Sequence, residues 1–289
     1  MALENYRKHA ELTRRAAQEK PDLIVWPEAA VYAGLLWDPK RKEWTRDEWY
    51  RRVVAPSRET EIRTLIGLLV VEREFGRRER AYTNSALYVD GEGEISDRFD
   101  KVHLVPFAEY VPFARTFPWI RDLTFKYSGL KLEDMRPGEG FPVWEVAGAR
   151  FGAQICFEAI FPEISREIAR KGAIFTVNIS NDGWFKASGE LDQMQVMARF
   201  RSIENRMQVI RATNTGISSF IEPTGRVQEI LEVGGRRKEV EGILVARIKV
   251  TDAGSLFRMV GNGVGWLAVG VAALVLAWRI LVDRRKKSA

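Results

Sequence analysis

The 289-residue sequence contains a single cysteine, Cys156, and only two histidines, His9 and His103. One cysteine excludes an internal disulfide framework and any zinc site built from several thiolates. Two histidines add too few further ligands for a metal cluster of cysteine and histidine. We therefore expect neither a metal nor a cofactor, so any chemistry must rely on ordinary side chains.

The sequence also lacks a cluster of charges of one sign. Lysine and arginine (45) only slightly outnumber aspartate and glutamate (39), which gives a net charge of +6. The tail 283–289 contains four cations and one acid, and so supplies half of this excess. Elsewhere cations and acids are interleaved along helix-like stretches, as on a solvated surface. Nucleic acid is therefore not an expected partner.

The N-terminus lacks the apolar stretch of a secretory signal peptide. Residues 1–22 are rich in charge, and the spacing of their apolar residues predicts an amphipathic helix. We therefore find no segment that would export the rest of the chain. Our expectation is that the chain is part of a longer membrane protein; a reversed membrane orientation is the alternative.

One long hydrophobic run is present near the C-terminus. Residues 259–278 contain one clearly polar side chain, Asn262, and tryptophans lie toward both ends of the run. A run of roughly 20 apolar residues matches the thickness of a bilayer, so we predict a transmembrane helix over 259–282. A buried core helix is the alternative. The basic tail 283–289 favours a cytoplasmic C-terminus, which would place residues 1–255 on the periplasmic face of a bacterial inner membrane.

Between these ends, strand-like and helix-like segments alternate. Apolar runs bounded by turn residues predict strands, with hairpins in the longer segments, over 22–28, 63–74, 81–100, 141–158, 173–180, 211–227 and 241–250. Helices are expected over 162–171, which begins with proline, and over 189–207. The pattern predicts an α/β domain with mixed sheets.

Three reactive side chains follow apolar strands: Glu28, Lys101 and Cys156. Taken singly, each has an ordinary explanation as a helix cap, a surface cation or a small buried hydrophobe. Together they form a chemically complete set. Glu28 could take the thiol proton, and Lys101 could stabilise an oxyanion. A Cys–His pair with His103 as base is the competing set, because His103 lies only two residues from Lys101.

Five segments resemble the nitrilase superfamily and, within it, the apolipoprotein N-acyltransferase branch. They are WPEAA (26–30), FDKVHLVPFAEYVPF (99–113), ICFEAIFPE (155–163), SNDGWF (180–185) and RATNTGISSFIEPTGRV (211–227). The resemblance covers about residues 20–250. It implies a nitrilase-like α-β-β-α sandwich over residues 1–255, with one C-terminal transmembrane helix.

The resemblance also implies roles for individual residues. Glu28 matches the general base, Lys101 the oxyanion stabiliser and Cys156 the nucleophile. Glu109 matches a second acid that orients the site, and Glu158 matches another functionally important acid. Phe157 and Trp184 are further candidates for substrate contact.

The reaction implied by the resemblance has two steps. A phospholipid donates an acyl chain to the thiolate, which gives a cysteine thioester. The N-terminal amine of a diacylglyceryl-cysteine lipoprotein then takes the acyl chain. The expected partners are therefore a phospholipid, an apolipoprotein and the membrane.

Aromatic residues near the expected site suggest an apolar rim or lid that meets acyl chains. They lie in the stretch 113–119 and at Trp184 and Phe185, and an ordinary core is the equal alternative. Two positions depart from the family pattern, since Phe157 replaces the usual tyrosine and Met194 replaces a histidine. The family's first strand and preceding membrane helices also have no counterpart in the sequence.

Two other functions remain open. One is an amidase of the same superfamily that hydrolyses C–N bonds in small amides, which would need no membrane span. The other is a catalytically inactive, membrane-anchored binding domain. The retention of all three reactive residues argues against the second function.

Overall fold

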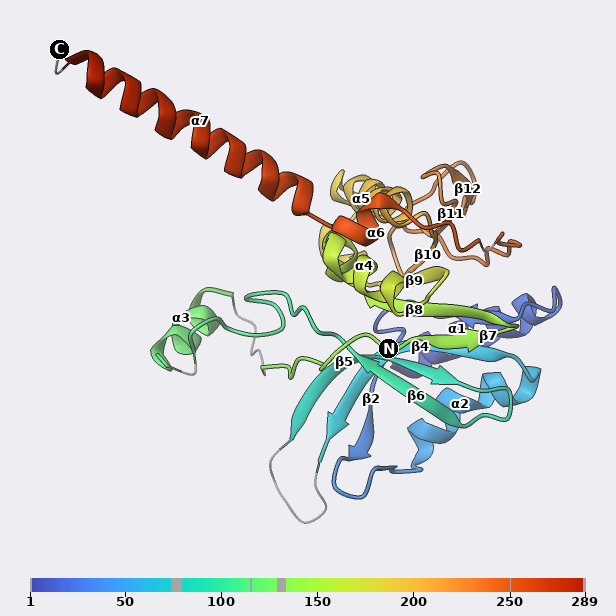
Figure 1. Ribbon diagram of the computed structural model, residues 1–289. Coiled ribbons are helices and arrows are strands. Elements are labelled where there is room, and N and C mark those ends of the chain that lie inside the picture. The colour runs from blue at the N-terminus through green and yellow to red at the C-terminus, as the bar shows by residue number, and fades with distance from the viewer. Residues whose placement is uncertain (1, 74–79, 115, 129–133, 250, 288–289) are drawn as a thin grey trace.

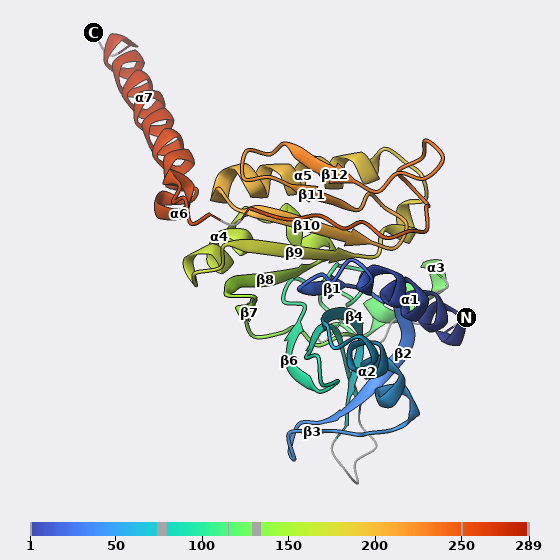
Figure 2. The same ribbon diagram turned by 90° about the vertical axis from the view of Figure 1, so that its right-hand side faces the viewer.

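The computed structural model describes residues 2–73, 80–114, 116–128, 134–249 and 251–287. Two six-stranded sheets form its body. The sheets are stacked on each other, and helices cover their outer faces (Figure 1, Figure 2). This arrangement confirms the expected α-β-β-α sandwich.

The first sheet comes from the N-terminal half of the chain, in the order β3-β2-β4-β5-β6, with β1 also paired to β4. Its strands are β1 (Leu23–Val25), β2 (Val31–Asp38), β3 (Glu43–Trp44), β4 (Arg63–Glu72), β5 (Ala81–Val89) and β6 (Ile95–Asp100). Helices α1 (Ala2–Ala17) and α2 (Glu48–Thr60) pack on the outer face of this sheet, where apolar side chains of both helices are buried.

The second sheet has the order β12-β11-β10-β9-β8-β7. Its strands are β7 (Trp144–Val146), β8 (Ala149–Ile155), β9 (Phe175–Ser180), β10 (Gln208–Thr213), β11 (Ser219–Ile221) and β12 (Val227–Ile230). The central strands β8, β9 and β10 are parallel. Parallel neighbours need crossover connections, and helices α4 (Pro162–Arg170) and α5 (Glu190–Asn205) provide them.

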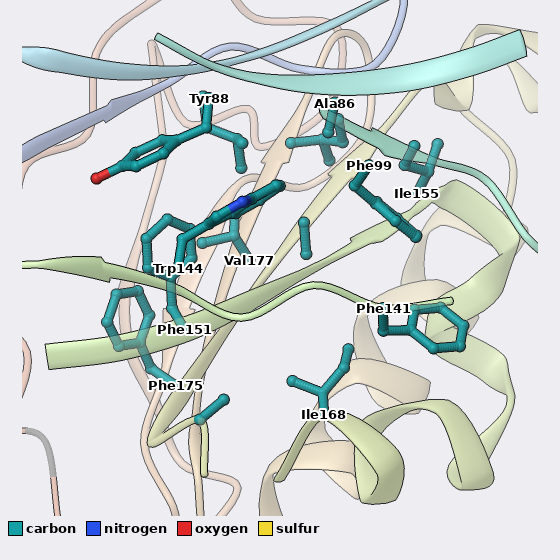
Figure 3. Close-up of a cluster of buried hydrophobic side chains, with 14 of the residues drawn as sticks. Ala86, Tyr88, Phe99, Phe141, Trp144, Phe151, Ile155, Ile168, Phe175 and Val177 are labelled. Atoms are coloured by element: carbon teal, nitrogen blue, oxygen red, sulfur yellow. The ribbon is translucent and has the colours of Figure 1, made fainter. Parts of the chain in front are cut away.

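An aromatic core holds the two sheets together (Figure 3). Tyr88 of the first sheet stacks on Trp144 of the second, with ring centroids 5.4 Å apart. Phe151 and Phe175 stack beneath them at 5.0 Å. Burying each large side chain stabilises the fold by roughly 1.5–3 kcal/mol. The core therefore fixes the spacing of the sheets, and hence the positions of the residues that follow their strands.

The C-terminal segment is fastened to the outer helices of the second sheet. The Arg166 guanidinium on α4 donates hydrogen bonds of 2.8–3.0 Å to three backbone carbonyls, those of Phe257, Arg258 and Met259. The Ser255 hydroxyl donates to the Glu204 carbonyl at 2.6 Å. These contacts tie the short helix α6 (Leu256–Val260) to the body just before the last helix begins.

Helix α7 (Gly263–Lys287) projects away from the body (Figure 1). Among the described residues it is the one helix long and apolar enough to cross a membrane, over Gly263–Ile280, and none of that stretch is buried. The predicted span of 259–282 begins four residues before α7, because residues 259 and 260 belong to the end of α6.

Most of the strands and helices expected from the sequence are present, but strand β3 and helices α2 and α3 (Trp119–Ser128) were not expected, and there are two further differences. Residues 241–249 were expected to form a strand, but the structure assigns none there. Strand β2 was not expected. Its pairing with β4 shifts register between Val31 and Leu35, so the regular alternation of a half-buried strand is absent.

Candidate active site

The three residues predicted from the sequence follow strands that end near one another. Glu28 lies shortly after β1, Lys101 directly follows β6, and Cys156 directly follows β8. The Lys101 ammonium lies 3.6 Å from the Glu28 carboxylate. Both charges act on the Cys156 thiol. The fold therefore brings together residues that are far apart in the sequence.

A glycine on β4 allows the Glu28 loop to lie close to the sheet. The backbone of Trp26 and Ala30 hydrogen bonds to β4 on either side of Glu28, so the chain leaves the sheet only briefly. A Cβ added at Gly67 would lie 2.4 Å from the Pro27 carbonyl oxygen and 2.6 Å from the Glu28 Cα. Only glycine leaves room for this approach.

Buried polar groups surround the Lys101 ammonium. It donates to Glu109 Oε1 at 2.9 Å. The Asn84 amide donates to both carboxylates, at 2.6 Å to Glu28 and 2.9 Å to Glu109. The backbone N–H of Asn181 donates to the other Glu28 oxygen at 2.6 Å. All three charged side chains are at most 8% exposed, so these contacts replace the lost solvation.

Burial sets the protonation of this cluster. The pKa of the Cys156 thiol is raised to about 12, chiefly by burial and also by the Glu28 carboxylate, whereas Lys101 acts to lower it. Burial also raises the pKa of Glu28, against the opposing effects of Lys101 and Asn84. Burial alone would lower the pKa of Lys101, but the surrounding anions outweigh it and raise that pKa. Near neutral pH the site therefore holds a protonated thiol beside a lysine cation.

Cys156 occupies a strained backbone conformation at the start of the 3₁₀ helix η1 (Cys156–Ile160). Its φ of 52° is left-handed, which costs a non-glycine residue on the order of 1–2 kcal/mol. Glu158 supports the turn, because Oε2 accepts from the Ile155 N–H at 2.8 Å. Its Oε1 accepts from the N–H groups of Val102 (2.8 Å) and His103 (3.1 Å). Glu158 thus links the thiol-bearing turn to the segment that follows Lys101.

The contacts of His103 do not favour the Cys–His alternative. Its ring packs on Phe161, with centroids 4.9 Å apart. Its Nδ1 is buried and has no hydrogen-bond partner among the described residues. The Phe157 ring also packs on Phe161, edge-on, with centroids 5.0 Å apart. His103 is therefore held in an aromatic group, whereas Glu28 and Lys101 are among the charged groups that shift the pKa of the thiol.

The aromatic residues expected to form a lid are exposed. Trp184, on the 3₁₀ helix η2 (Asp182–Phe185), is 70% exposed, and Phe113, before helix α3 (Trp119–Ser128), is 75% exposed. Phe117 and Trp119 are at least half exposed as well. An ordinary core does not account for these side chains. Met194, where the family has histidine, is buried on α5.

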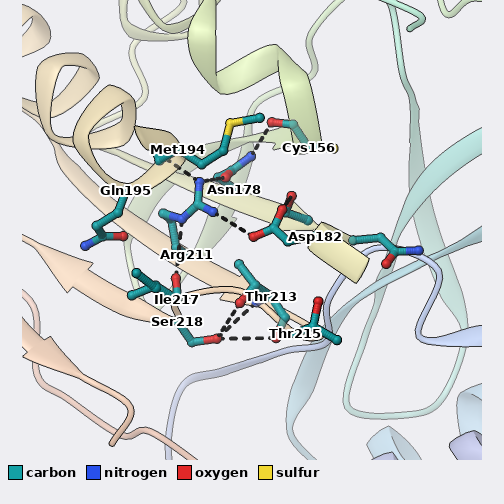
Figure 4. A network of polar contacts seen from close by, with 12 residues as sticks. Cys156, Asn178, Asp182, Met194, Gln195, Arg211, Thr213, Thr215, Ile217 and Ser218 are labelled. Atoms are coloured by element: carbon teal, nitrogen blue, oxygen red, sulfur yellow. Dashed lines mark hydrogen bonds and ion pairs between the residues drawn. The ribbon is translucent and has the colours of Figure 1, made fainter. Parts of the chain in front are cut away.

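The sequence analysis missed a second set of buried polar residues beside Cys156 (Figure 4). Its members are Asn178, Ser180, Asp182 and Arg211, all at most 2% exposed. Three of them lie within predicted apolar strands, as does Asn84 beside Glu28, and a polar residue inside such a strand was the available signal. Among the described residues, no group of three or more His, Cys, Asp or Glu side chains could hold a metal ion.

Comparison with known proteins defines the class of this fold and site. The carbon-nitrogen hydrolase family model matches residues 2–257, and the chain belongs to this family. The fold is similar to that of an amidase from Nesterenkonia sp. AN1, with a TM-score of 0.57 and 19% identity over 80% of this chain and 83% of the amidase. In a related structure of that amidase, acrylamide has added to the active-site cysteine.

Curated relatives are more similar in sequence. The chain is 33% identical to the apolipoprotein N-acyltransferase of Geobacter metallireducens, over 96% of this chain and 49% of the relative. It is 34% identical to apolipoprotein N-acyltransferase 1 of Treponema pallidum, over 84% of this chain and 45% of the relative. The chain therefore spans about half the length of these relatives.

Proposed function

We propose that this protein is an N-acyltransferase that moves a fatty acyl chain from a phospholipid to the N-terminal amine of a diacylglyceryl-cysteine lipoprotein. The observation that carries the proposal is the buried Glu28–Lys101 pair, whose charges both act on the Cys156 thiol. The names of the curated relatives support the acyltransferase reaction over other reactions of the family.

In the first half-reaction, Glu28 accepts the thiol proton as the sulfur attacks the ester carbonyl of the phospholipid. A base is required because the raised pKa of Cys156 keeps the thiol protonated at neutral pH. Lys101 stabilises the oxyanion. This oxyanion arises as the C–S bond forms; on its collapse the C–O ester bond breaks, and Glu28 returns the proton to the departing lysophospholipid oxygen.

In the second half-reaction, the neutral amine of the acceptor attacks the thioester. An amide C–N bond forms and the C–S bond breaks. Glu28 accepts the proton lost by the amine and passes it to the departing sulfur, which restores the thiol. Both steps use Glu28 to transfer a proton and Lys101 to stabilise an oxyanion, so one site serves the phospholipid and the amine.

Glu109 and Glu158 serve as positioning residues in this scheme. Glu109 shares the Lys101 ammonium and is fixed by Asn84 and by the Val105 N–H at 2.8 Å. Glu158 holds the turn that carries Cys156. Neither acid therefore needs to contact the substrate to affect the reaction.

The exposed aromatic residues form an apolar rim that meets acyl chains and limits access of water to the thioester. Replacing both Phe117 and Trp119 with aspartate should slow acylation by phospholipid but leave the fold intact. Exposed Tyr32, at 55%, offers a matched control by Tyr32→Asp. Normal acylation by the double variant would remove the rim from the proposal.

Helix α7 anchors the catalytic domain beside its lipid substrates. The apolar stretch Gly263–Ile280 of this helix is not buried in the protein, which suits a bilayer rather than water. The basic tail favours a cytoplasmic C-terminus, and so supports a position of residues 1–255 on the periplasmic face of the inner membrane.

The first half-reaction is tested by intact-protein mass. The chain, solubilised in detergent, is incubated with a diacyl phospholipid, in parallel with Cys156→Ala. We expect an added acyl mass that hydroxylamine removes and that the variant lacks. No adduct, together with turnover of small soluble amides, would favour the family's amidase chemistry instead.

A further inference from the structure

A fully buried ion pair belongs to the polar network beside Cys156 (Figure 4). Arg211 on β10 and Asp182 on η2 are joined at 3.2 Å, and neither side chain is exposed. A Cβ at Gly216 would lie 1.8 Å from the Asp182 carboxylate, so glycine is needed for the acid to fit. Removing two charges from water is costly, and a hydrophobic pair often stabilises a fold as well. The proposed reaction leaves this pair without a role.

Arg211 controls the orientation of the Asn178 amide (Figure 4). Its Nη1 donates to Asn178 Oδ1 at 2.8 Å. The amide nitrogen must then point the other way, where it donates to the Cys156 carbonyl at 3.3 Å. This carbonyl belongs to the residue with the left-handed backbone. Arg211 therefore acts on the strained turn through Asn178.

Asp182 connects the same pair to the thiol through Ser180. The Ser180 hydroxyl donates to Asp182 Oδ1, and the same hydroxyl lowers the pKa of the Cys156 thiol. A hydroxyl has one proton. While this proton is directed to Asp182, Ser180 offers the sulfur only lone pairs, which suit a protonated thiol. A thiolate needs the proton turned toward sulfur.

We propose that the Arg211–Asp182 pair is a positioning element for Cys156, in which Arg211 fixes the nucleophile turn through Asn178 and neutralises Asp182 so that Ser180 can turn its proton toward the sulfur. The inference rests on the proposed role of Cys156 as nucleophile. It adds a second polar network, besides Glu28 and Lys101, to the groups that permit thiolate formation.

The two partners of the pair should act on the thiol in opposite directions. Asp182 raises the pKa of Cys156, whereas the thiolate and Arg211 attract each other. Removing Arg211 leaves an uncompensated anion near the sulfur, and removing Asp182 leaves an uncompensated cation. The other charged or titratable groups near the thiol are unchanged in both variants; they are Glu28, Lys101, His103, Glu109 and Glu158.

The test is the rate of Cys156 alkylation by iodoacetamide, in the full chain in detergent, as a function of pH. The sequence has no other cysteine, so every adduct reports this thiol. At a pH below the thiol pKa, we expect Arg211→Met to slow alkylation about tenfold and Asp182→Asn to accelerate it, since one pKa unit changes the thiolate fraction about tenfold. Arg211→Lys restores the charge and should recover part of the rate.

The exposed pair of Arg226 and Glu222 provides a matched control, because Arg226→Met removes the same side chain where it is 74% exposed. This variant should alkylate at the unaltered rate. Changes of the same sign in Arg211→Met and Asp182→Asn, or no change in folded variants, would overturn the proposal. If Arg211→Met does not fold, Asp182→Asn and Ser180→Ala decide the matter, with acceleration expected for the first and slowing for the second.

Alkylation needs no acyl donor, so this test is independent of the proposed function. A protein that forms no thioester but shows the opposed changes would contradict only the proposed reaction. A protein that acylates normally but lacks the opposed changes would contradict only the role of the Arg211–Asp182 pair.

Discussion

The candidate active site and the last helix depart from the usual distribution of residues in opposite ways. At the site, charged side chains are buried, and Lys101 is only 1% exposed. On α7, large apolar side chains are exposed, and Trp266 is 74% exposed. Buried charges require partners within the protein, whereas exposed apolar side chains require a partner outside it. The charges of the first region therefore find their partners within the protein, and for the second region the proposed partner is a membrane.

The largest expected effect comes from removing the cation at the site. Lys101→Met should reduce the rate of thioester formation about 100-fold to 1000-fold, since it removes the proposed oxyanion donor. The rate is measured by acyl mass gained from phospholipid over time. His103→Ala is the control and should remain active. An inactive His103→Ala beside an active Lys101→Met would favour the Cys–His mechanism.

A charge on the last helix should have the next largest effect. Ala272 lies near the middle of the apolar stretch, and Ala272→Arg should disfavour membrane insertion by about 2.5–3.5 kcal/mol. Extraction by alkaline carbonate measures this change. Ala272→Leu is the matched control and should stay in the membrane fraction. Equal retention of both variants would argue that α7 does not span the bilayer.

Glu158 should make stability depend on pH. Burial raises its pKa to about 7, while the N–H groups of Ile155, His103 and Val102 lower it. The folded state therefore binds the Glu158 proton more tightly than the unfolded state does. Glu158 therefore adds to the free energy of unfolding at low pH. This contribution, about 3 kcal/mol in total, is fully present below about pH 4.5 and is lost as the pH rises through about 7.

The variant Glu158→Gln cannot titrate, so its free energy of unfolding should vary less across this window. Denaturant titrations at several pH values between about 4.5 and 7 measure the slope. The exposed Glu145→Gln should retain the slope of the parent protein. An unchanged slope in Glu158→Gln would show that other groups set the pH dependence.

The smallest effect is expected at Phe157. Its ring is partly exposed and contacts Phe161 edge-on, so a tyrosine hydroxyl can reach solvent without disturbing the core. Phe157→Tyr should change the acylation rate by less than about threefold, or about 0.7 kcal/mol in the barrier. A larger gain would mean that the hydroxyl usual in this family has a direct part in the reaction.

Strand periodicity, a local signal, predicted an α/β domain with mixed sheets and three of the clustered residues, whereas the sandwich itself was implied by the resemblance to the nitrilase superfamily. Glu28, Lys101 and Cys156 each follow an apolar strand, and sheet edges bring such positions together. The Arg211–Asp182 pair could not be found in this way. Its partners are 29 residues apart, and their contact depends on the parallel pairing of β9 and β10.

Errors arose where local patterns and tertiary structure disagree. The apolar alternation of 241–249 resembles a strand, yet this segment lies along the body without a strand assignment. Asn84 lies within the predicted strand segment 81–100, and its amide donates hydrogen bonds to both Glu28 and Glu109. A polar residue within an apolar strand indicates that a partner exists, but does not identify it.

The most direct test of the central claim is transfer from a preformed acyl-enzyme. The chain is acylated with phospholipid, separated from the excess lipid, and mixed with a peptide that begins with diacylglyceryl-cysteine. We predict that the acyl mass leaves Cys156 and appears on the peptide amine as an amide resistant to hydroxylamine. Release of free fatty acid at the same rate with or without the peptide would contradict the account and identify a hydrolase.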